Sequence, residues 1–71
     1  LGEIKARSLF RCLLKLGFVV AHGKGSHRLM KHADGRILLF AFHDEETVGP
    51  KMLKKVLKDA EVSEDEFRSV K

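Results

Sequence analysis

The sequence has little of what anchors or cross-links many small proteins. Its single cysteine, Cys12, excludes a disulfide framework and fits a reducing compartment. No stretch approaches the ~20 apolar residues that a membrane span requires, and Leu1–Ile4 lacks the charged and apolar regions of a signal peptide. We therefore expect a soluble, cytoplasmic protein in which Cys12 is a small buried side chain.

Several common catalytic patterns are also missing. The four histidines and Cys12 do not show the spacing of a zinc site, and no pair of carboxylates suggests a glycosidase or a protease. Ser26 has no recognisable histidine–acid partner set, so we do not expect it to act as a nucleophile. We expect a site with no metal and no small-molecule cofactor.

Basic charge is present, and it is unevenly distributed. Lysine and arginine number 14 against 10 acidic residues. Residues 5–43 contain eight of these basic residues and one acid, whereas residues 44–71 contain six basic and eight acidic residues. Such a distribution favours an anionic partner, with RNA as the first candidate and an ordinary solvated surface as the alternative.

The length of 71 residues predicts one small domain over residues 1–71 with a thin core. Apolar periodicity predicts an α+β fold, in the order α-β-β-β-α(-α). The predicted elements are a helix from about Ile4 to Leu16, strands at Phe18–His22, Ser26–His32 and Arg36–Phe42, an acidic loop at His43–Gly49, a helix from Pro50, and a short helix at Glu64–Val70. We expect a three-stranded antiparallel sheet with helices on one face.

Glycines and capping residues indicate where these elements end. Gly17 is expected to end the first helix in a left-handed conformation. The segment from Gly23 to Gly25 predicts a flexible turn, and Asp34-Gly35 predicts a type I′ hairpin turn. The segment from Ser63 to Glu66 has the form of a capping box.

The end of the glycine-rich turn contains the candidate catalytic group. His27 follows Gly25 and Ser26 and lies between Lys24 and Arg28 in the sequence. Histidine has an unperturbed pKa of ~6.5 and can take or give a proton near neutral pH. Two cations beside it attract a phosphate backbone. We predict that His27 carries a proton in RNA cleavage and that Lys24 and Arg28 contact phosphates.

RNA cleavage usually needs two proton-transferring groups, and only one stands out in the sequence. One group removes the proton of the 2′-hydroxyl, and the other protonates the leaving oxygen. His43, which precedes three acids, is the alternative second group, while His22 and His32 are expected to be structural or solvated. The third predicted strand is apolar on both faces, so one face is either covered or offered to a protein partner.

The order and spacing of short motifs resemble one known family. The matching segments are Lys5–Leu9, Lys15–Phe18, Lys24–Arg28, His32–Arg36, Phe42-His43, Leu57–Ala60 and Ser63–Phe67. Together they resemble the HicA family of toxin ribonucleases, the mRNA interferases of toxin–antitoxin systems. The resemblance covers almost the whole chain. Its most specific parts are, in order, the helix that ends in Gly17-Phe18, the Lys-Gly-Ser-His run that ends at His27, and Asp34-Gly35-Arg36.

The resemblance implies a fold similar to the double-stranded RNA-binding domain, cleavage of single-stranded mRNA through one histidine, and silencing by a HicB-like antitoxin. The family's catalytic histidine corresponds to His27, and Gly25 and Ser26 complete its motif. Glu61 departs from the family pattern, because relatives often have glycine there. The alternative function is a non-catalytic RNA-binding module with the same fold and the same RNA contacts.

Overall fold

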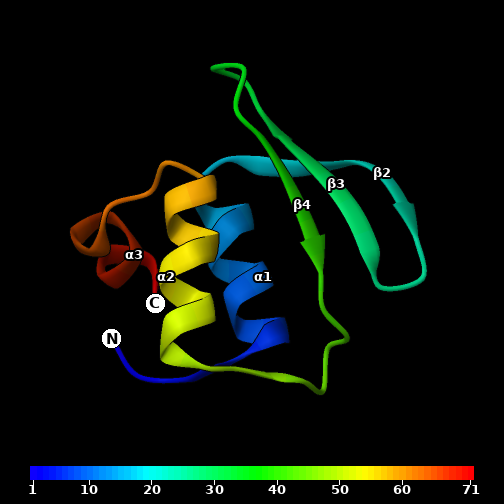
Figure 1. Ribbon diagram of the computed structural model, residues 1–71. Coiled ribbons are helices and arrows are strands. Elements are labelled where there is room, and N and C mark those ends of the chain that lie inside the picture. The colour runs from blue at the N-terminus through cyan, green and yellow to red at the C-terminus, as the bar shows by residue number, and fades with distance from the viewer.

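Two helices cover one face of a three-stranded antiparallel sheet, and a third, shorter helix lies beside them (Figure 1). The computed structural model describes residues 1–71. Its elements are β1 (Ile4–Lys5), α1 (Ala6–Lys15), β2 (Phe18–Lys24), β3 (His27–His32), β4 (Ile37–Ala41), β5 (Thr47–Val48), α2 (Pro50–Asp59) and α3 (Glu64–Val70). The predicted α+β class and the predicted order of helices and main strands are confirmed.

The helices are held by apolar residues that recur at helical spacing. Leu9 and Leu13 of α1 are fully buried, and Leu53 and Leu57 of α2 are 2% and 3% exposed. They belong to one core cluster with sheet residues such as Met30. None of the three helices has the length and apolar character that a membrane-spanning segment needs.

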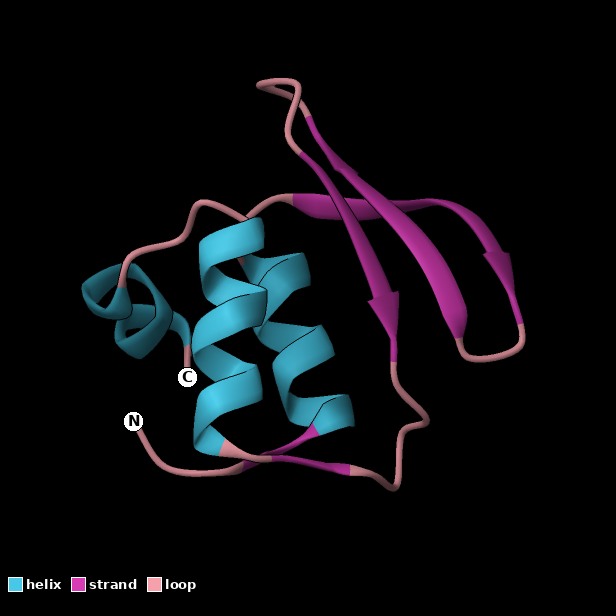
Figure 2. Ribbon diagram, in the orientation of Figure 1, coloured by secondary structure: helices cyan, strands magenta, loops and turns pink.

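The two faces of the sheet have different environments. Met30, Leu38 and Phe40 are buried beneath the helices, whereas Ile37 and Leu39 are 57% and 62% exposed. Figure 2 shows the helices gathered to one side of the sheet. We refer to the uncovered side as the open face. The strand register places on it Val19, His22, Lys24, His27, Leu29, Lys31, Ile37, Leu39 and Ala41.

The first helix begins later than predicted. Ile4 and Lys5 form β1, which pairs antiparallel with β5 inside the segment predicted to be an acidic loop. Both the helix start at Ile4 and the fully irregular loop are therefore wrong. Pairing Ile4 with Val48 leaves these side chains 8% and 1% exposed, so the burial of two apolar residues distant in sequence determines the local structure.

The first hairpin turn is shorter than predicted. β2 continues through Gly23 and Lys24, and Lys24 pairs with His27. The turn consists of Gly25 and Ser26 alone, so the prediction of a flexible turn from Gly23 to Gly25 is wrong. Cross-strand hydrogen bonding has extended the strand into the glycine-rich segment.

The second hairpin lies where the sequence predicted it but has a different turn. Gly35 has a φ of 100°, and Asp34 does not have a positive φ, so the predicted type I′ turn is wrong. The Gly35 N–H donates to the His32 carbonyl at 2.9 Å, and the His32 N–H donates to the Arg36 carbonyl at 2.9 Å. These bonds define a three-residue loop that ends in a glycine bulge.

The predicted helix ends are confirmed. Gly17 has a φ of 102° after the last turn of α1. At α3 the Ser63 hydroxyl accepts a hydrogen bond from the Glu66 N–H at 3.1 Å, and the Ser63 N–H donates to the Glu66 carboxylate at 3.1 Å. This reciprocal pair is the predicted capping box.

Candidate active site on the open face of the sheet

His27 is the first residue of β3 and is exposed on the open face. It pairs with Lys24 on one side and with Ala41 on the other. Side chains directly opposite each other in antiparallel strands have Cβ atoms about 5 Å apart. Lys24 therefore places a cation beside the imidazole, while the small Ala41 leaves the other side open.

The turn between β2 and β3 establishes this pairing. Gly25 has a φ of 61°, and a Cβ added there would meet no atom within 4 Å. Glycine is therefore favoured at this position by backbone conformation and not by lack of space. A glycine with positive φ at the first centre, followed by Ser26 without one, fits a type II′ turn. Ser26 is half-buried within it.

Arg28 lies on the helix-covered face, on the opposite side of the sheet from His27. Its guanidinium carbon is 4.5 Å from the centre of the Phe10 ring, and its Nη2 atom is 3.3 Å from an Asp44 carboxylate oxygen. Its Nη1 atom is buried without a hydrogen-bond partner. Phosphate binding by Arg28 stays a prediction, and such a phosphate would not be the one beside His27.

His32 is held between the end of α1 and the second hairpin. Its Nε2 is 2.9 Å from the Leu16 carbonyl, and its Nδ1 is 3.2 Å from the Asp34 N–H. Nδ1 also lies 3.1 Å from an Asp34 carboxylate oxygen, so both ring nitrogens have a defined partner. A Cβ at Gly17 would lie 2.6 Å from Nε2, so glycine also makes room for this ring. His32 was predicted to be either structural or solvated, and these contacts confirm the structural alternative.

Arg36 has a structural contact that the sequence reasoning missed. Its Nη1 donates to the carbonyls of Ala60 and Glu61 at 2.8 and 3.0 Å, and its Nε donates to Asp34 at 2.9 Å. The side-chain hydrogen bond from Arg36 is the main reason that the pKa of Asp34 lies below its usual value. An arginine directly after a hairpin glycine was the only available sequence signal.

The remaining histidines differ in their relation to His27. His22 is exposed and lies on the open face, opposite Leu29 of β3. His43 lies in the loop two residues after Ala41, and its N–H donates to the Glu46 carboxylate at 2.9 Å. No three His, Cys, Asp or Glu side chains come together in an arrangement that could hold a metal ion.

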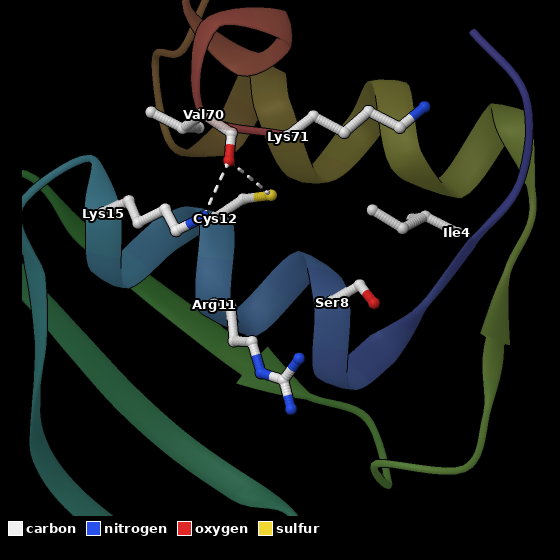
Figure 3. A pocket seen from close by; sticks show the side chains of 7 residues that line it. All are labelled: Ile4, Ser8, Arg11, Cys12, Lys15, Val70 and Lys71. Carbon is white, nitrogen blue, oxygen red and sulfur yellow. Dashed lines mark hydrogen bonds between the residues drawn. The ribbon is translucent and has the colours of Figure 1, made fainter.

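The largest cavity lies away from the open face, between α1 and α3 (Figure 3). It has a volume of about 300 Å³ and is lined by Ile4, Ser8, Arg11, Cys12, Lys15, Val70 and Lys71. Lys15 Nζ and Cys12 Sγ both approach the Val70 carbonyl, at 3.4 and 3.8 Å. Burial raises the pKa of the Cys12 thiol, and its predicted role as a small buried residue is confirmed by its 4% exposure.

Comparison with known families adds an independent finding to this geometry. A family model described as the HicA toxin of bacterial toxin–antitoxin systems matches residues 6–62. The matched range includes α1, the whole three-stranded sheet and α2. The search of curated proteins found no match.

Proposed function

The chain belongs to the HicA toxin family of toxin–antitoxin systems, and from this premise we propose that it is an endoribonuclease that cleaves mRNA with His27 as a proton-transferring group. The observation that carries the proposal is the position of His27. It is exposed on the open face, at the start of a strand and directly opposite Lys24. An extended RNA strand can approach this face without displacing any helix.

The proposed reaction is an internal transesterification that needs no metal. The RNA supplies its own nucleophile, the 2′-hydroxyl next to the scissile phosphate. Removal of the hydroxyl proton lets this oxygen attack phosphorus, the bond to the 5′-oxygen breaks, and that oxygen takes up a proton. The products are a 2′,3′-cyclic phosphate and a 5′-hydroxyl. His27 serves one of these two proton transfers.

Lys24, Gly25 and Ser26 are the proposed RNA contacts next to His27. The Lys24 ammonium stabilises the negative charge that builds up on the phosphate oxygens during attack. The Gly25-Ser26 turn exposes backbone next to the imidazole. Arg28 contributes from the other face by holding the β3 strand against α1 through Phe10, and its proposed phosphate lies further along the RNA.

Membership of the family implies a cognate antitoxin, and we propose a HicB-like protein that covers the open face. This face combines exposed apolar side chains with cations. Val19 and Leu39 are 60% and 62% exposed, and Lys24 and Lys31 share the face with them. An acidic partner with an apolar contact surface would block RNA through the same residues.

The test compares wild-type protein with His27→Ala on single-stranded RNA, with and without EDTA. We expect His27→Ala to lower the cleavage rate by at least about 10²-fold, and we expect EDTA to have no effect on the wild-type protein. Lys55→Ala, an exposed change on α2, is the control and should cleave normally. Circular dichroism checks that each variant is folded.

Two outcomes would overturn the proposal. One is cleavage by His27→Ala at the wild-type rate. The other is a wild-type protein that binds RNA without cutting it, which would favour the non-catalytic RNA-binding module.

A further inference from the structure

We propose that His22 is the second proton-transferring group of the cleavage reaction, an inference that rests on the proposed ribonuclease function. The reaction removes a proton from the 2′-oxygen and delivers a proton to the 5′-oxygen, on opposite sides of the phosphorus atom. One imidazole beside one of these oxygens does not serve both in a single step. The open face carries a second imidazole, from β2.

A β-bulge brings His22 to this face. Val20 pairs with Met30, and His22 pairs with Leu29, so Ala21 is an extra residue with no partner. In an uninterrupted strand His22 would share the helix-covered face with Val20, because side chains alternate. The bulge reverses that alternation and turns the imidazole towards the open face. Bulges that re-aim a side chain are frequent beside active sites.

The register then makes His22 a diagonal neighbour of His27. Leu29 lies opposite His22, and His27 is two residues before Leu29 on the same strand. Diagonal neighbours in an antiparallel pair are about 7–8 Å apart at the backbone, within reach of two imidazole rings that lean towards a shared ligand. Both histidines are exposed. A phosphate between them has one imidazole on each side.

The charge of the surrounding face suits this arrangement. Lys24 follows His22 by two residues and lies opposite His27, and Lys31 is the remaining charged residue of the open face. No carboxylate is among the residues of this face, so nothing there competes with the phosphate for the cations. The two acids next to these strands have partners elsewhere: Asp34, in the β3–β4 hairpin, pairs with Arg36, and Asp44, after β4, pairs with Arg28 of the other face.

His43 is a weaker candidate for the same task. It lies outside the paired strands, and its backbone is tied to Glu46 in both directions, with the Glu46 N–H donating to the His43 carbonyl at 3.0 Å. The pairing of β3 with β4 ends at Ala41, so no strand register fixes the position of His43 relative to His27, whereas the pairing of β2 with β3 fixes that of His22. The experiment below distinguishes His43 from His22 as the second proton-transferring group.

In the proposed step one imidazole of the pair starts neutral and the other starts protonated. The neutral ring accepts the 2′-hydroxyl proton, the 2′-oxygen forms a bond to phosphorus, and the phosphorus–5′-oxygen bond breaks. The protonated ring donates its proton to the departing 5′-oxygen. No oxidant, reductant or cofactor enters, and the protonation states return to the start when the two rings exchange protons with water.

The experiment measures single-turnover cleavage of a defined RNA at a mapped wild-type cleavage site by wild type, His22→Ala, His22→Arg, His27→Ala and His43→Ala. We expect His22→Ala to be slower than wild type by about 10²-fold or more. His22→Arg keeps a cation but cannot transfer protons near neutral pH, so it should be equally slow. His43→Ala should stay close to wild type.

A second substrate, with sulfur in place of the scissile 5′-oxygen, identifies the acid. A thiolate leaves without protonation, so the variant that lacks the acid should regain most of its rate on this RNA, while the variant that lacks the base should not. If the sulfur-substituted RNA restores the cleavage rate of only one of the two variants, His22→Ala or His27→Ala, the result supports His22 and His27 as an acid–base pair.

The inference fails if His22→Ala cleaves within twofold of wild type, if His22→Arg restores the rate, or if His43→Ala shows the large loss instead. In those cases, loss of cleavage by His27→Ala would still support the proposed ribonuclease function, and only the assignment of His22 would be wrong. A His27→Ala variant that is fully active, or a wild-type protein without cleavage, would refute both together. Thermal unfolding of each variant excludes loss of folding as the cause.

Discussion

Glu61 has a backbone conformation that disfavours its own side chain. Its φ is 55°, in the left-handed region that normally favours glycine. The Glu61 N–H donates to the Lys58 carbonyl and the Val62 N–H to the Leu57 carbonyl, at 3.0 and 2.9 Å. This is the hydrogen-bond pattern of a Schellman motif at the end of α2. Glu61 therefore occupies the left-handed position after a helix that glycine adopts without strain.

We predict that Glu61→Gly stabilises the protein. A non-glycine residue in the left-handed region costs about 1–2 kcal/mol, and the extra freedom of glycine in the unfolded chain offsets part of this gain. The expected increase in the free energy of unfolding is about 0.5–1 kcal/mol, measured by urea denaturation. Glu61→Ala is the control, because it removes the carboxylate but keeps the Cβ. Equal stabilisation by both variants would assign the effect to charge.

At the scale of the elements, Arg36 ties the β3–β4 hairpin to the end of α2. It donates to the carbonyls of Ala60 and Glu61 and lies over the Phe18 ring at 5.1 Å. The carbonyls at the end of a helix lack partners within the helix. The planar guanidinium of Arg36 donates hydrogen bonds to two of these carbonyls and to the Asp34 carboxylate at the same time. An ammonium group cannot make all three bonds with the same geometry.

We predict that Arg36→Lys lowers the melting temperature by several degrees and that Arg36→Ala lowers it further. The physical reason is the loss of charge-assisted hydrogen bonds to carbonyl groups at a half-buried site. Lys55→Ala, which removes an exposed ion pair with Asp59, should change the melting temperature little. A lysine variant as stable as wild type would show that charge, and not the planar fork, is what matters at this position.

At the scale of the whole molecule, two carboxyl groups link stability to pH. The side-chain hydrogen bond from Arg36 lowers the pKa of Asp34, and the backbone hydrogen bond from Ser63 lowers that of Glu66. In the unfolded chain Asp and Glu side chains titrate at about pH 4. Below that pH the unfolded chain binds protons more readily than the folded one, so stability falls as the pH falls.

We predict that these two groups contribute their full stabilisation above about pH 5 and lose it as the pH decreases through the folded-state pKa values. Urea midpoints measured between pH 7 and pH 2 should therefore fall most steeply at the acid end. A double variant, Asp34→Asn with Glu66→Gln, should show a shallower fall because neither position titrates. An unchanged acid profile in the double variant would place the responsible carboxyl groups elsewhere.

Much of the fold follows from local sequence patterns. The apolar spacing in α1 and α2, the glycine after α1 and the capping box of α3 all act within a few residues, so the sequence alone predicts them. Alternation along β3 also places His27 and Met30 on opposite faces. The position of His27 beside a glycine turn was therefore predictable, as was the α+β class.

Only the tertiary structure decided the features that depend on register between distant segments. The pairing of β1 with β5 joins residues more than 40 positions apart, and it replaced the predicted start of the first helix. The contact of Arg36 with the end of α2 and the Phe10–Arg28 stacking likewise depend on how helices meet the sheet. The bulge at Ala21 placed His22 on the same open face as His27. A one-residue shift in register exchanges the faces of a strand, and that shift is determined by cross-strand pairing, which no local pattern contains.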